Sequence, residues 1–294
     1  MIRAAPILGR TLLTIGAYTT MLRIPFTGLT AASKELSAIS NNLANANTIG
    51  FKKSNAEFGD FMAPDSATVL NSQIGKGATT IGMKRNIEQG SLQQTSNSLD
   101  VALQGEGYMV FGASTSAQAS GGETYSRAGK LTLNSDGYLV DDSGSPLMGN
   151  QSLSGTLQNP NMQPINIFKS VGNDPQNVGS ISIDSQGLIS VVPASGGDPV
   201  KVAYIATARF ENENGMQALG GNKFSASQSS GVAQYGRGGS DGFGTFAQGS
   251  LENSNVDITS ELMQMIAAQQ AYNGNSRALQ TGSDMLRSLT EQVS

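Results

Sequence analysis

The 294 residues of this sequence contain no histidine and no cysteine, so carboxylates are the side chains that we consider for acid–base or nucleophilic chemistry. That absence removes Ser-His-Asp and Cys-His catalysis and the usual zinc and iron–sulfur ligands. Asp100, Glu106, Asp136 and Asp184 are left as candidates for a carbohydrate-active site. Each lies in or beside an expected turn, where a solvated aspartate or glutamate is the ordinary explanation. We therefore expect no catalytic site, no cofactor and no metal ligands.

Charge and motif disfavour two ligand classes, nucleic acids and nucleotides. The formal net charge is -4, so the chain has no basic footprint for nucleic acid. The glycine-rich stretch YGRGGSDGFGTFAQGS, residues 235–250, lacks the Gly-Lys-Ser/Thr ending and the following helix of a phosphate-binding loop. We expect it to be a flexible return to the C-terminal helix, and we expect neither a nucleic-acid partner nor a small-molecule substrate.

The composition favours a structural protein over a compact enzyme. Hydrophobic residues make up 38%, charged residues 14%, and there are 36 glycines, which suits short strands, many turns and amide-rich surfaces. Residues 1–20 are interpreted as a leader or as an upstream start, with Met21 as the natural first residue. Arg10 interrupts their apolar run, which is too short to span a bilayer.

Both ends of the chain carry helical patterns. From Thr27, apolar residues recur at alternating spacings of three and four, which predicts a helix that packs along another helix. These residues are Leu29, Ala32, Leu36, Ile39, Leu43 and Ala46. Near the other end, Asn255 or Asp257 can cap a helix that runs almost to the terminus. Its apolar seam comprises Ile258, Leu262, Met265, Tyr272, Leu279, Leu286 and Val293. We expect the two helices to pair.

The C-terminal seam is regular but not uniformly apolar. From Met265 onward one large apolar residue recurs every seven, whereas the alternate seam positions are Gln269, Ser276 and Ser283. These polar positions disfavour a maximally stable two-helix coil and suit a helix that also contacts neighbouring subunits.

The middle of the chain has the period-two pattern of strands. LTLNSDGYLV at 131–140 and ISIDSQGLIS at 181–190 form a weak internal repeat. Each predicts a hairpin whose turn needs a positive φ, at Gly137 and at Gly187. VKVAYIATARF, residues 200–210, predicts another strong strand.

The sequence therefore predicts an α+β fold, in which paired N- and C-terminal helices flank a central, mostly antiparallel β domain. The expected segments are a leader or start region at 1–20, the N-terminal helix with a connecting segment at 21–75, the β domain at 76–253, and the C-terminal helix at 254–294.

The first helix should stop within the stretch SNNLANANTIGFKKS. Asn45 and Asn47 tolerate the left-handed conformation, and Gly50 adopts it freely. Beyond this stop, Lys52 and Lys53 are expected to remain solvated or to bind carboxylates across an interface.

Long stretches at both ends resemble one protein family. GLTAASKELSAISNNLANANTIGFKKSNAEFGDFM is similar to the N-terminal signature of the bacterial flagellar rod and hook family. GSLENSNVDITSELMQMIAAQQAYNGNSRALQTGSDML is similar to its C-terminal signature. Between them, GSLQQTSNSLDVALQGEGYMVF and YSRAGKLTLNSDGYLVDDSGSPL resemble the central β domain of the family.

The resemblance implies a non-enzymatic axial protein that is exported through the flagellar type III apparatus and polymerises helically around a central channel. It places the paired terminal helices along the inner tube and the β domain outside. The implied partners are copies of itself, the export apparatus, and other axial proteins of the rod, hook cap and hook–filament junction. The implied location is the flagellar basal body or hook, extracellular after export.

The resemblance and the apolar seams together give the expected assembly residues. Those that match the family motifs are Asn41, Asn42, Leu43, Ala44, Asn45, Thr48, Gly50 and Phe51, and Ser254, Asn255, Val256, Glu261, Leu262, Met265, Ile266, Gln269, Tyr272 and Asn275. The expected assembly interface consists of Leu29, Leu36, Ile39, Asn41, Asn42, Leu43, Asn45, Gly50, Phe51, Leu262, Met265, Ile266, Gln269, Tyr272, Leu279 and Leu286.

Within the family, we favour a hook protein, which links rod to filament and transmits motor torque. The segment between Phe51 and Gly77 is short, whereas distal rod proteins usually carry a longer insertion there. The chain is also too short for the additional outer β domain common in hook proteins, which keeps a distal rod protein as the alternative. A secreted adhesin with helical stalks is a third interpretation, beside the carbohydrate-active protein considered above.

Overall fold

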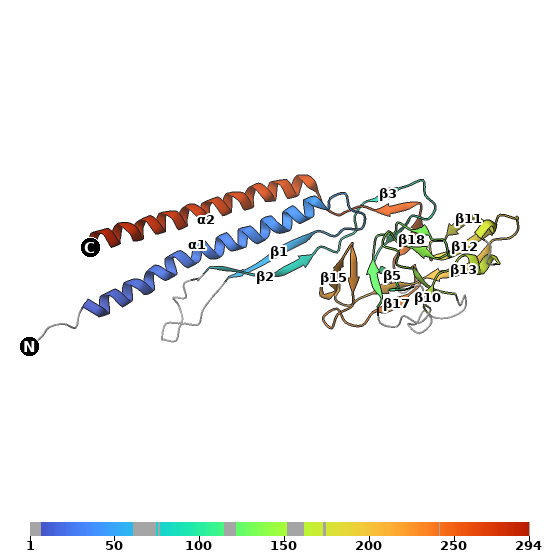
Figure 1. Cartoon of the computed structure of the whole chain (residues 1–294), viewed down its shortest axis with the longest axis horizontal. Helices are drawn as coiled ribbons and strands as arrows, with labels where there is room; N and C mark the ends of the chain where they lie inside the picture. The colour runs from blue at the N-terminus through green and yellow to red at the C-terminus, as the bar shows by residue number, and fades with distance from the viewer. Residues whose placement is uncertain are drawn as a thin grey trace, which may run out of the picture. The chain divides into compact units, whose positions relative to one another are not determined.

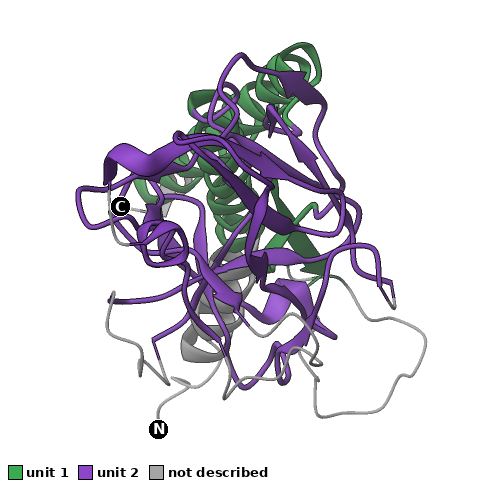
Figure 2. Ribbon diagram, turned by 90° about the vertical axis from the view of Figure 1, so that its right-hand side faces the viewer, with its two compact units in different colours: residues 1–44, 54–86, 256–294 green, residues 45–53, 87–255 purple. Residues whose placement is uncertain are grey.

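The computed structural model describes residues 7–60, 75, 77–114, 122–151, 162–172, 175–240 and 242–293, with side chains from residue 22 onward except those of 289, 292 and 293. The chain forms two compact units, which Figure 2 colours separately. Unit 1 comprises residues 1–44, 54–86 and 256–294, and unit 2 comprises residues 45–53 and 87–255. Residues 45–53 belong to unit 2, which contains most of the strands, although the sequence analysis placed them in the segment 21–75 with the N-terminal helix.

The described residues of unit 1 form two long helices and a β hairpin. The helix α1 spans Ile7–Ala44 and α2 spans Ile258–Val293. They lie side by side and run in opposite directions (Figure 1). The strands β1 (Ser54–Asp60) and β2 (Ala78–Arg85) pair antiparallel and contact α1. The expected pairing of the terminal helices is therefore present.

The helix boundaries follow local capping chemistry. Asp257 precedes α2, and its Oδ1 accepts a hydrogen bond from the Thr259 N–H at 2.9 Å, which makes Asp257 rather than Asn255 the N-cap. The helix α1 begins at Ile7, earlier than the apolar seam found from Thr27, and it continues through Pro25. Residues 1–6 of the expected leader lie outside the described residues. In the part of the chain that the structure describes, no helix is long and apolar enough to span a bilayer.

In its described residues, unit 2 is built from short strands and three 3₁₀ turns. The strands are β3 (Leu92–Gln94), β4 (Val101–Gln104), β5 (Tyr108–Phe111), β6 (Thr124–Ser126), β7 (Thr132–Leu133), β8 (Leu139–Val140), β9 (Met148–Asn150), β10 (Gln163–Pro164), β11 (Val178–Ile183), β12 (Leu188–Pro193), β13 (Val200–Ile205), β14 (Thr207–Arg209), β15 (Gln217–Gly220), β16 (Lys223–Ser225), β17 (Gln234–Gly236), β18 (Thr245–Gln248) and β19 (Ser250–Glu252); the turns are η2 (Phe168–Val171), η3 (Pro175–Asn177) and η4 (Glu213–Gly215).

These strands pair antiparallel in two larger sheets. The five-stranded sheet has the order β10-β9-β13-β12-β11, and the six-stranded sheet has the order β15-β16-β6-β5-β14-β17. The ribbons β18-β4, β19-β3 and β7-β8 complete the unit. The α+β prediction with a mostly antiparallel β region is therefore confirmed.

The strand predicted at residues 200–210 is divided at Ala206. Its first part, β13, pairs in the five-stranded sheet, and its second part, β14, pairs in the six-stranded sheet. The Ala206 N–H donates to the Met148 carbonyl at 3.0 Å, and its own carbonyl accepts from Val110 N at 3.3 Å. One continuous apolar run therefore serves two sheets, which its alternation pattern did not indicate.

The two predicted hairpin repeats have the same turn geometry, as expected. Gly137 has φ 83° and Gly187 has φ 80°. Each glycine N–H donates back to the first turn residue, Asn134 at 3.1 Å and Asp184 at 2.8 Å. Because only glycine adopts this φ freely, the prediction of a positive φ at both positions is confirmed.

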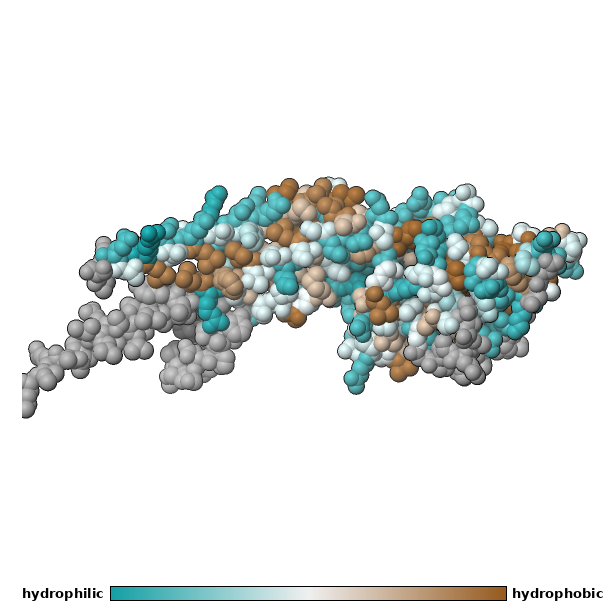
Figure 3. All heavy atoms as spheres, viewed as in Figure 1, coloured by the Kyte–Doolittle hydropathy of each residue, from teal (hydrophilic) through white to brown (hydrophobic). Residues whose placement is uncertain are grey.

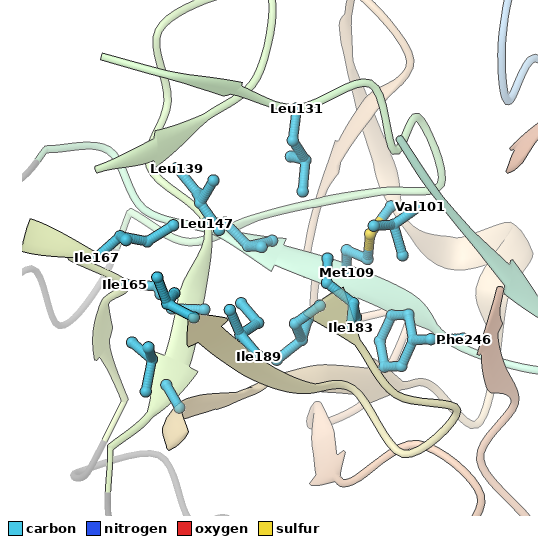
Figure 4. Packing of buried hydrophobic residues seen from close by; sticks show 14 of the residues in the cluster. Val101, Met109, Leu131, Leu139, Leu147, Ile165, Ile167, Ile183, Ile189 and Phe246 are labelled. Atoms are coloured by element: carbon cyan, nitrogen blue, oxygen red, sulfur yellow. The ribbon is translucent and has the colours of Figure 1, made fainter. Parts of the chain in front are cut away.

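Two apolar clusters fill unit 2. The larger one includes Val101, Leu147 and Phe246 (Figure 4). The strand β5 contributes to both clusters, because Met109 and Phe111 point into the larger one whereas Tyr108 and Val110 belong to the second. Phe246 is 5% exposed and lies in the glycine-rich stretch, so this return to α2 is packed into the core and is not the flexible connection expected from its composition.

Candidate assembly site

Residues 45–53, the segment that follows α1, are bound into unit 2 by main-chain hydrogen bonds. Gly50 has φ 67°, and its N–H donates to the Glu252 carbonyl at 2.7 Å. The Ile49 carbonyl accepts from Asn222 Nδ2 at 2.7 Å. Gly50 is thus the left-handed residue, as predicted, whereas Asn45 and Asn47 have negative φ values. The Asn-rich stop is a docked segment of unit 2.

A buried ionic cluster, Lys52, Arg127 and Glu252, fastens the end of this segment. Lys52 Nζ lies 2.5 Å from Glu252 Oε1, and Arg127 Nη1 lies 3.6 Å from Glu252 Oε2. The three residues are 4%, 3% and 0% exposed, respectively. Burial lowers the pKa of the Lys52 amino group below its usual value, although the Glu252 carboxylate opposes this shift. Lys52 is therefore neither solvated nor paired across an interface, contrary to expectation.

Neighbouring groups add further hydrogen bonds to the cluster, whereas Glu252 Oε2 and Arg127 Nε and Nη1 have no hydrogen-bond partner among the described residues. Glu252 Oε1 accepts from the Gly90 N–H at 2.9 Å, and Lys52 Nζ donates to the Glu88 carbonyl at 2.7 Å. Asn255 Oδ1 accepts from the Lys53 N–H at 2.8 Å, and Asn255 Nδ2 donates to the Glu88 carbonyl at 2.9 Å. Three stretches that are distant in sequence are thus held together beside the points where the chain leaves unit 2.

In unit 1, a buried amide links α1 to α2 and to the hairpin. Asn42 Nδ2 donates to Glu261 Oε2 at 3.1 Å and to the Ser54 carbonyl at 3.0 Å. Asn42 Oδ1 accepts from the Ser54 N–H at 2.9 Å. Asn42 is 1% exposed and Glu261 is 0% exposed. Asn42 and Glu261, which both match the family motifs, therefore contact each other within one chain.

The outer face of α2 is apolar where it begins. Ile258, Leu262 and Ile266 follow one another at spacings of four and are 46%, 44% and 56% exposed, so they share one face of the helix. Figure 3 shows hydrophobic atoms gathered over the first turns of α2. We call these three residues the α2 stripe. Large exposed apolar side chains elsewhere in unit 1 include Ile24, Phe26, Phe58, Ile81 and Met83.

The residues expected at an assembly interface divide into three groups. Those buried or half-buried within unit 1 are Leu29, Leu36, Ile39, Asn42, Leu43, Met265, Leu279 and Leu286. Those exposed on unit 1 are Asn41, Leu262, Ile266, Gln269 and Tyr272. Asn45, Gly50 and Phe51 lie in the docked segment of unit 2. The structure therefore does not bring all sixteen together on one surface.

Two of the four candidate catalytic carboxylates, Asp100 and Glu106, have local structural partners. Asp100 accepts from Thr95 Oγ1 at 2.8 Å and from Asn97 Nδ2 at 2.9 Å. Glu106 lies 3.9 Å from Arg209 at the surface. Among the described residues, no three or more acidic side chains are grouped so that they could hold a metal ion.

Sequence reasoning missed the partners of Lys52. Local patterns did not indicate Glu252 and Arg127 as partners, because both lie far from Lys52 along the chain. Glu261 was recognised as a motif residue, yet its helical position does not show that it faces Asn42. A single acidic residue within the seam pattern of α2 is the one feature that could have indicated it.

Three family descriptions match successive parts of the chain. "Flagella basal body rod protein" matches residues 22–52, "Flagellar hook protein FlgE/F/G D1 domain" matches residues 102–191, and "Flagellar basal body rod FlgEFG protein C-terminal" matches residues 247–292. The chain belongs to this family of flagellar basal-body rod and hook proteins, which places it in the basal body or hook of the flagellum and makes it a structural axial component.

Individual relatives separate the two branches of the family. The flagellar basal-body rod protein FlgG of Caulobacter vibrioides is 33% identical over 282 residues, covering 92% of this chain and 98% of the relative. FlgG of Bacillus subtilis is 32% identical over 283 residues, with the same coverage of 92% and 98%. The flagellar hook protein FlgE of Brucella suis is 23% identical over 395 residues, covering 90% of this chain and 97% of the relative. The comparisons thus favour the rod alternative over the hook interpretation.

Proposed function

We propose that this protein is a distal rod subunit, which polymerises into the tubular shaft of the flagellar basal body. The observation that carries this proposal is the end-to-end match to FlgG relatives, 98% of whose length aligns with this chain at 33% identity. The alignment with the hook protein extends over 395 positions, more than the 294 residues of this chain, so it must contain long gaps. The short segment after Phe51, which suggested a hook protein, is outweighed by this full-length agreement.

Self-association is supported by the exposed apolar side chains of unit 1. Leu262 and Ile266 are large apolar side chains that are exposed to water. Exposed apolar patches of this kind mark interaction surfaces. We infer that the exposed members of the expected interface (Asn41, Leu262, Ile266, Gln269 and Tyr272) contact neighbouring subunits. The buried members shape the helix pair that presents them.

The proposed role needs no catalytic residue, cofactor or metal. Its partners are copies of the same chain, adjoining axial proteins of the rod and hook, and the type III export apparatus. Nucleic acids and small-molecule substrates have no part in it.

Basal bodies from a deletion strain test the proposal by electron microscopy. Loss of a distal rod subunit should leave a truncated rod without a hook. A full-length rod that lacks only its hook would instead assign the hook function to this protein. Complementation with the wild-type gene should restore rod length and motility.

The same strain tests the α2 stripe. Leu262→Asp places a charge on the proposed contact surface, so we expect truncated rods although the exported subunit is present. Gln264→Asp, an exposed position on the side of the same helix opposite Leu262, is the matched control and should complement fully. Normal rods from Leu262→Asp would show that subunit contacts do not use this face.

A further inference from the structure

The apolar contacts between α1 and α2 do not by themselves define how far one helix is shifted along the other. Met265, Tyr272, Leu279 and Leu286 recur every seven residues along α2. A displacement by seven residues therefore places each large side chain where its equivalent had been. The apolar seam alone thus permits several alignments of similar energy.

The observed antiparallel alignment is defined by three contacts. Asn42 meets Glu261. A Cβ added at Gly28 would lie 2.8 Å from the Asn275 side chain, and one added at Gly282 would lie 2.8 Å from Leu22 Cδ2. In an antiparallel helix pair, the numbers of facing residues have a constant sum. The three pairs have nearly the same sum, so all three contacts belong to one register.

We propose that the buried Asn42–Glu261 pair fixes this register. A displacement by seven residues would bring Ala268 or Ser254 opposite Asn42. Ala268 has no side-chain acceptor, and Ser254 precedes α2. Asn42 would then lose one acceptor while its Oδ1 remains held by the Ser54 N–H.

Displacement would also be energetically unfavourable for Glu261. Its Oε2 accepts from Asn42, whereas its Oε1 has no hydrogen-bond partner among the described residues. Loss of Asn42 would leave a buried carboxylate without any side-chain donor, which is strongly unfavourable. A single buried polar pair is a well-attested way to select one register in a helix pair.

The register determines where the α2 stripe lies along α1. A displacement by seven residues moves a helix by about 10 Å along its axis. Under the proposed function, neighbouring subunits would then meet a different surface. The register itself is a property of the single chain, so it is measured without any assembly.

Disulfide cross-linking of the full-length monomer tests the proposal, since the chain contains no cysteine. Gly28→Cys with Asn275→Cys reports the observed register, because these positions lie within bonding reach. Glu35→Cys with Asn275→Cys reports the register displaced by seven residues, because Glu35 lies seven residues after Gly28 on α1. Each reporter pair is combined with wild-type Glu261, with Glu261→Gln and with Glu261→Leu, and its oxidation rate is followed in dilute solution by gel mobility.

With wild-type Glu261, the observed-register pair should oxidise at least about tenfold faster than the displaced pair, as expected when one register is favoured by a buried hydrogen bond. Glu261→Gln retains an acceptor and should preserve this ratio. Glu261→Leu should raise the oxidation rate of the displaced reporter relative to that of the observed-register reporter. The pairing of residues 50–53 with residues 252–255, which this substitution leaves in place, limits the increase.

Three results would overturn the proposal. One is an unchanged ratio in Glu261→Leu, and another is equal rates for the two reporters in the wild-type background. The third is an equal loss of both reporters in Glu261→Leu, which would mean that the pair supports helix association without selecting its register. Failure of the distal rod assignment in the deletion strain would leave these rates unchanged, so the two proposals fail separately.

Discussion

Unit 2 and unit 1 differ in how many of their large apolar side chains are exposed. Of the fourteen large hydrophobic side chains exposed in the described residues, eleven lie in unit 1 and three (Leu92, Leu219 and Val232) lie in unit 2. Unit 2 nevertheless contains both apolar core clusters. Unit 2 therefore buries its own apolar side chains, whereas unit 1 leaves many for another surface to cover. This division suits a subunit whose stable part folds alone and whose helical part is completed by neighbours.

The two units also differ in the partners of their buried carboxylates. In unit 2, the Glu252 carboxylate faces two cations, Lys52 and Arg127. In unit 1, the Glu261 carboxylate is bound by one amide, that of Asn42. The charged groups of unit 2 are thus paired within its core. Glu261, the single buried acid among the described residues of unit 1, has the aligning role that we propose above.

The largest effect should follow from Glu252→Leu. The substitution leaves Lys52 and Arg127 buried without their carboxylate, which typically costs about 3–5 kcal/mol. Urea unfolding followed by near-ultraviolet circular dichroism measures this loss, because most tyrosines lie in unit 2. Replacing all three charged residues by apolar ones should recover much of it, since the unpaired charges are then gone.

An exposed ion pair in unit 1 provides the control for this effect. Glu57 Oε1 lies 3.4 Å from Lys84 Nζ, with both side chains about half exposed. Glu57→Gln should change the free energy of unfolding by less than about 1 kcal/mol, measured by far-ultraviolet circular dichroism, which reports the helices of unit 1. Equal losses from Glu57→Gln and Glu252→Leu would contradict the contrast between the two units.

Gly50→Ala should have the next largest effect. Gly50 has φ +67°, and an added Cβ would lie 2.9 Å from the Ala128 backbone nitrogen. Strain and close approach together should lower the stability of unit 2 by about 1–3 kcal/mol. Gly144→Ala is the matched control, because Gly144 has φ +78° with no atom within 4 Å of the added Cβ. If both variants lose the same stability, the docking of residues 45–53 against Ala128 contributes nothing.

Local patterns in the sequence predicted much of the fold. The terminal helices, Asp257 as a possible cap, and the turns at Gly137 and Gly187 depend on neighbouring residues, so periodicity and glycine placement indicated them. The division of the 200–210 strand at Ala206 was not predicted, because both halves have the same alternation. The choice of sheet depends on long-range pairing with β9, β12, β5 and β17.

The candidate site was less predictable than the fold, for the same physical reason. Lys52 follows a helix stop, where a lysine is ordinarily solvated, and its acidic partner is Glu252, near the other end of the chain. Met265 and Leu279 of the C-terminal seam are half-buried in the structure. The same seam also includes Leu262, which the structure places on the outer face. A spacing of three and four identifies an apolar stripe without showing whether its partner is the same chain or another.

A smaller effect on unit 2 should appear at alkaline pH. Burial raises the pKa of Tyr125 to about 12, against an ordinary value of 10.0, and the nearby Glu123 carboxylate adds to the shift. The folded form thus retains a proton that the unfolded form loses, so this stabilisation is complete below pH 10.0 and is lost as the pH rises towards about 12. The unfolding midpoint should fall over this window, and less steeply in Tyr125→Phe. Parallel curves for the two proteins would show that Tyr125 does not contribute.

The smallest effect on stability should come from Ile266→Gln in unit 1. Ile266 is 56% exposed, and glutamine favours the helix at least as well as isoleucine. The free energy of unfolding of the monomer should therefore change by no more than about 0.5 kcal/mol. Leu147→Ala in the core of unit 2 removes a comparable apolar side chain that is 0% exposed, and should cost about 2–5 kcal/mol. If Ile266→Gln destabilised the isolated monomer as much as Leu147→Ala, the first turns of α2 would already be covered within the single chain. The apolar surface of unit 1 would then no longer distinguish it from unit 2, and the argument for a neighbouring subunit at this face would fail.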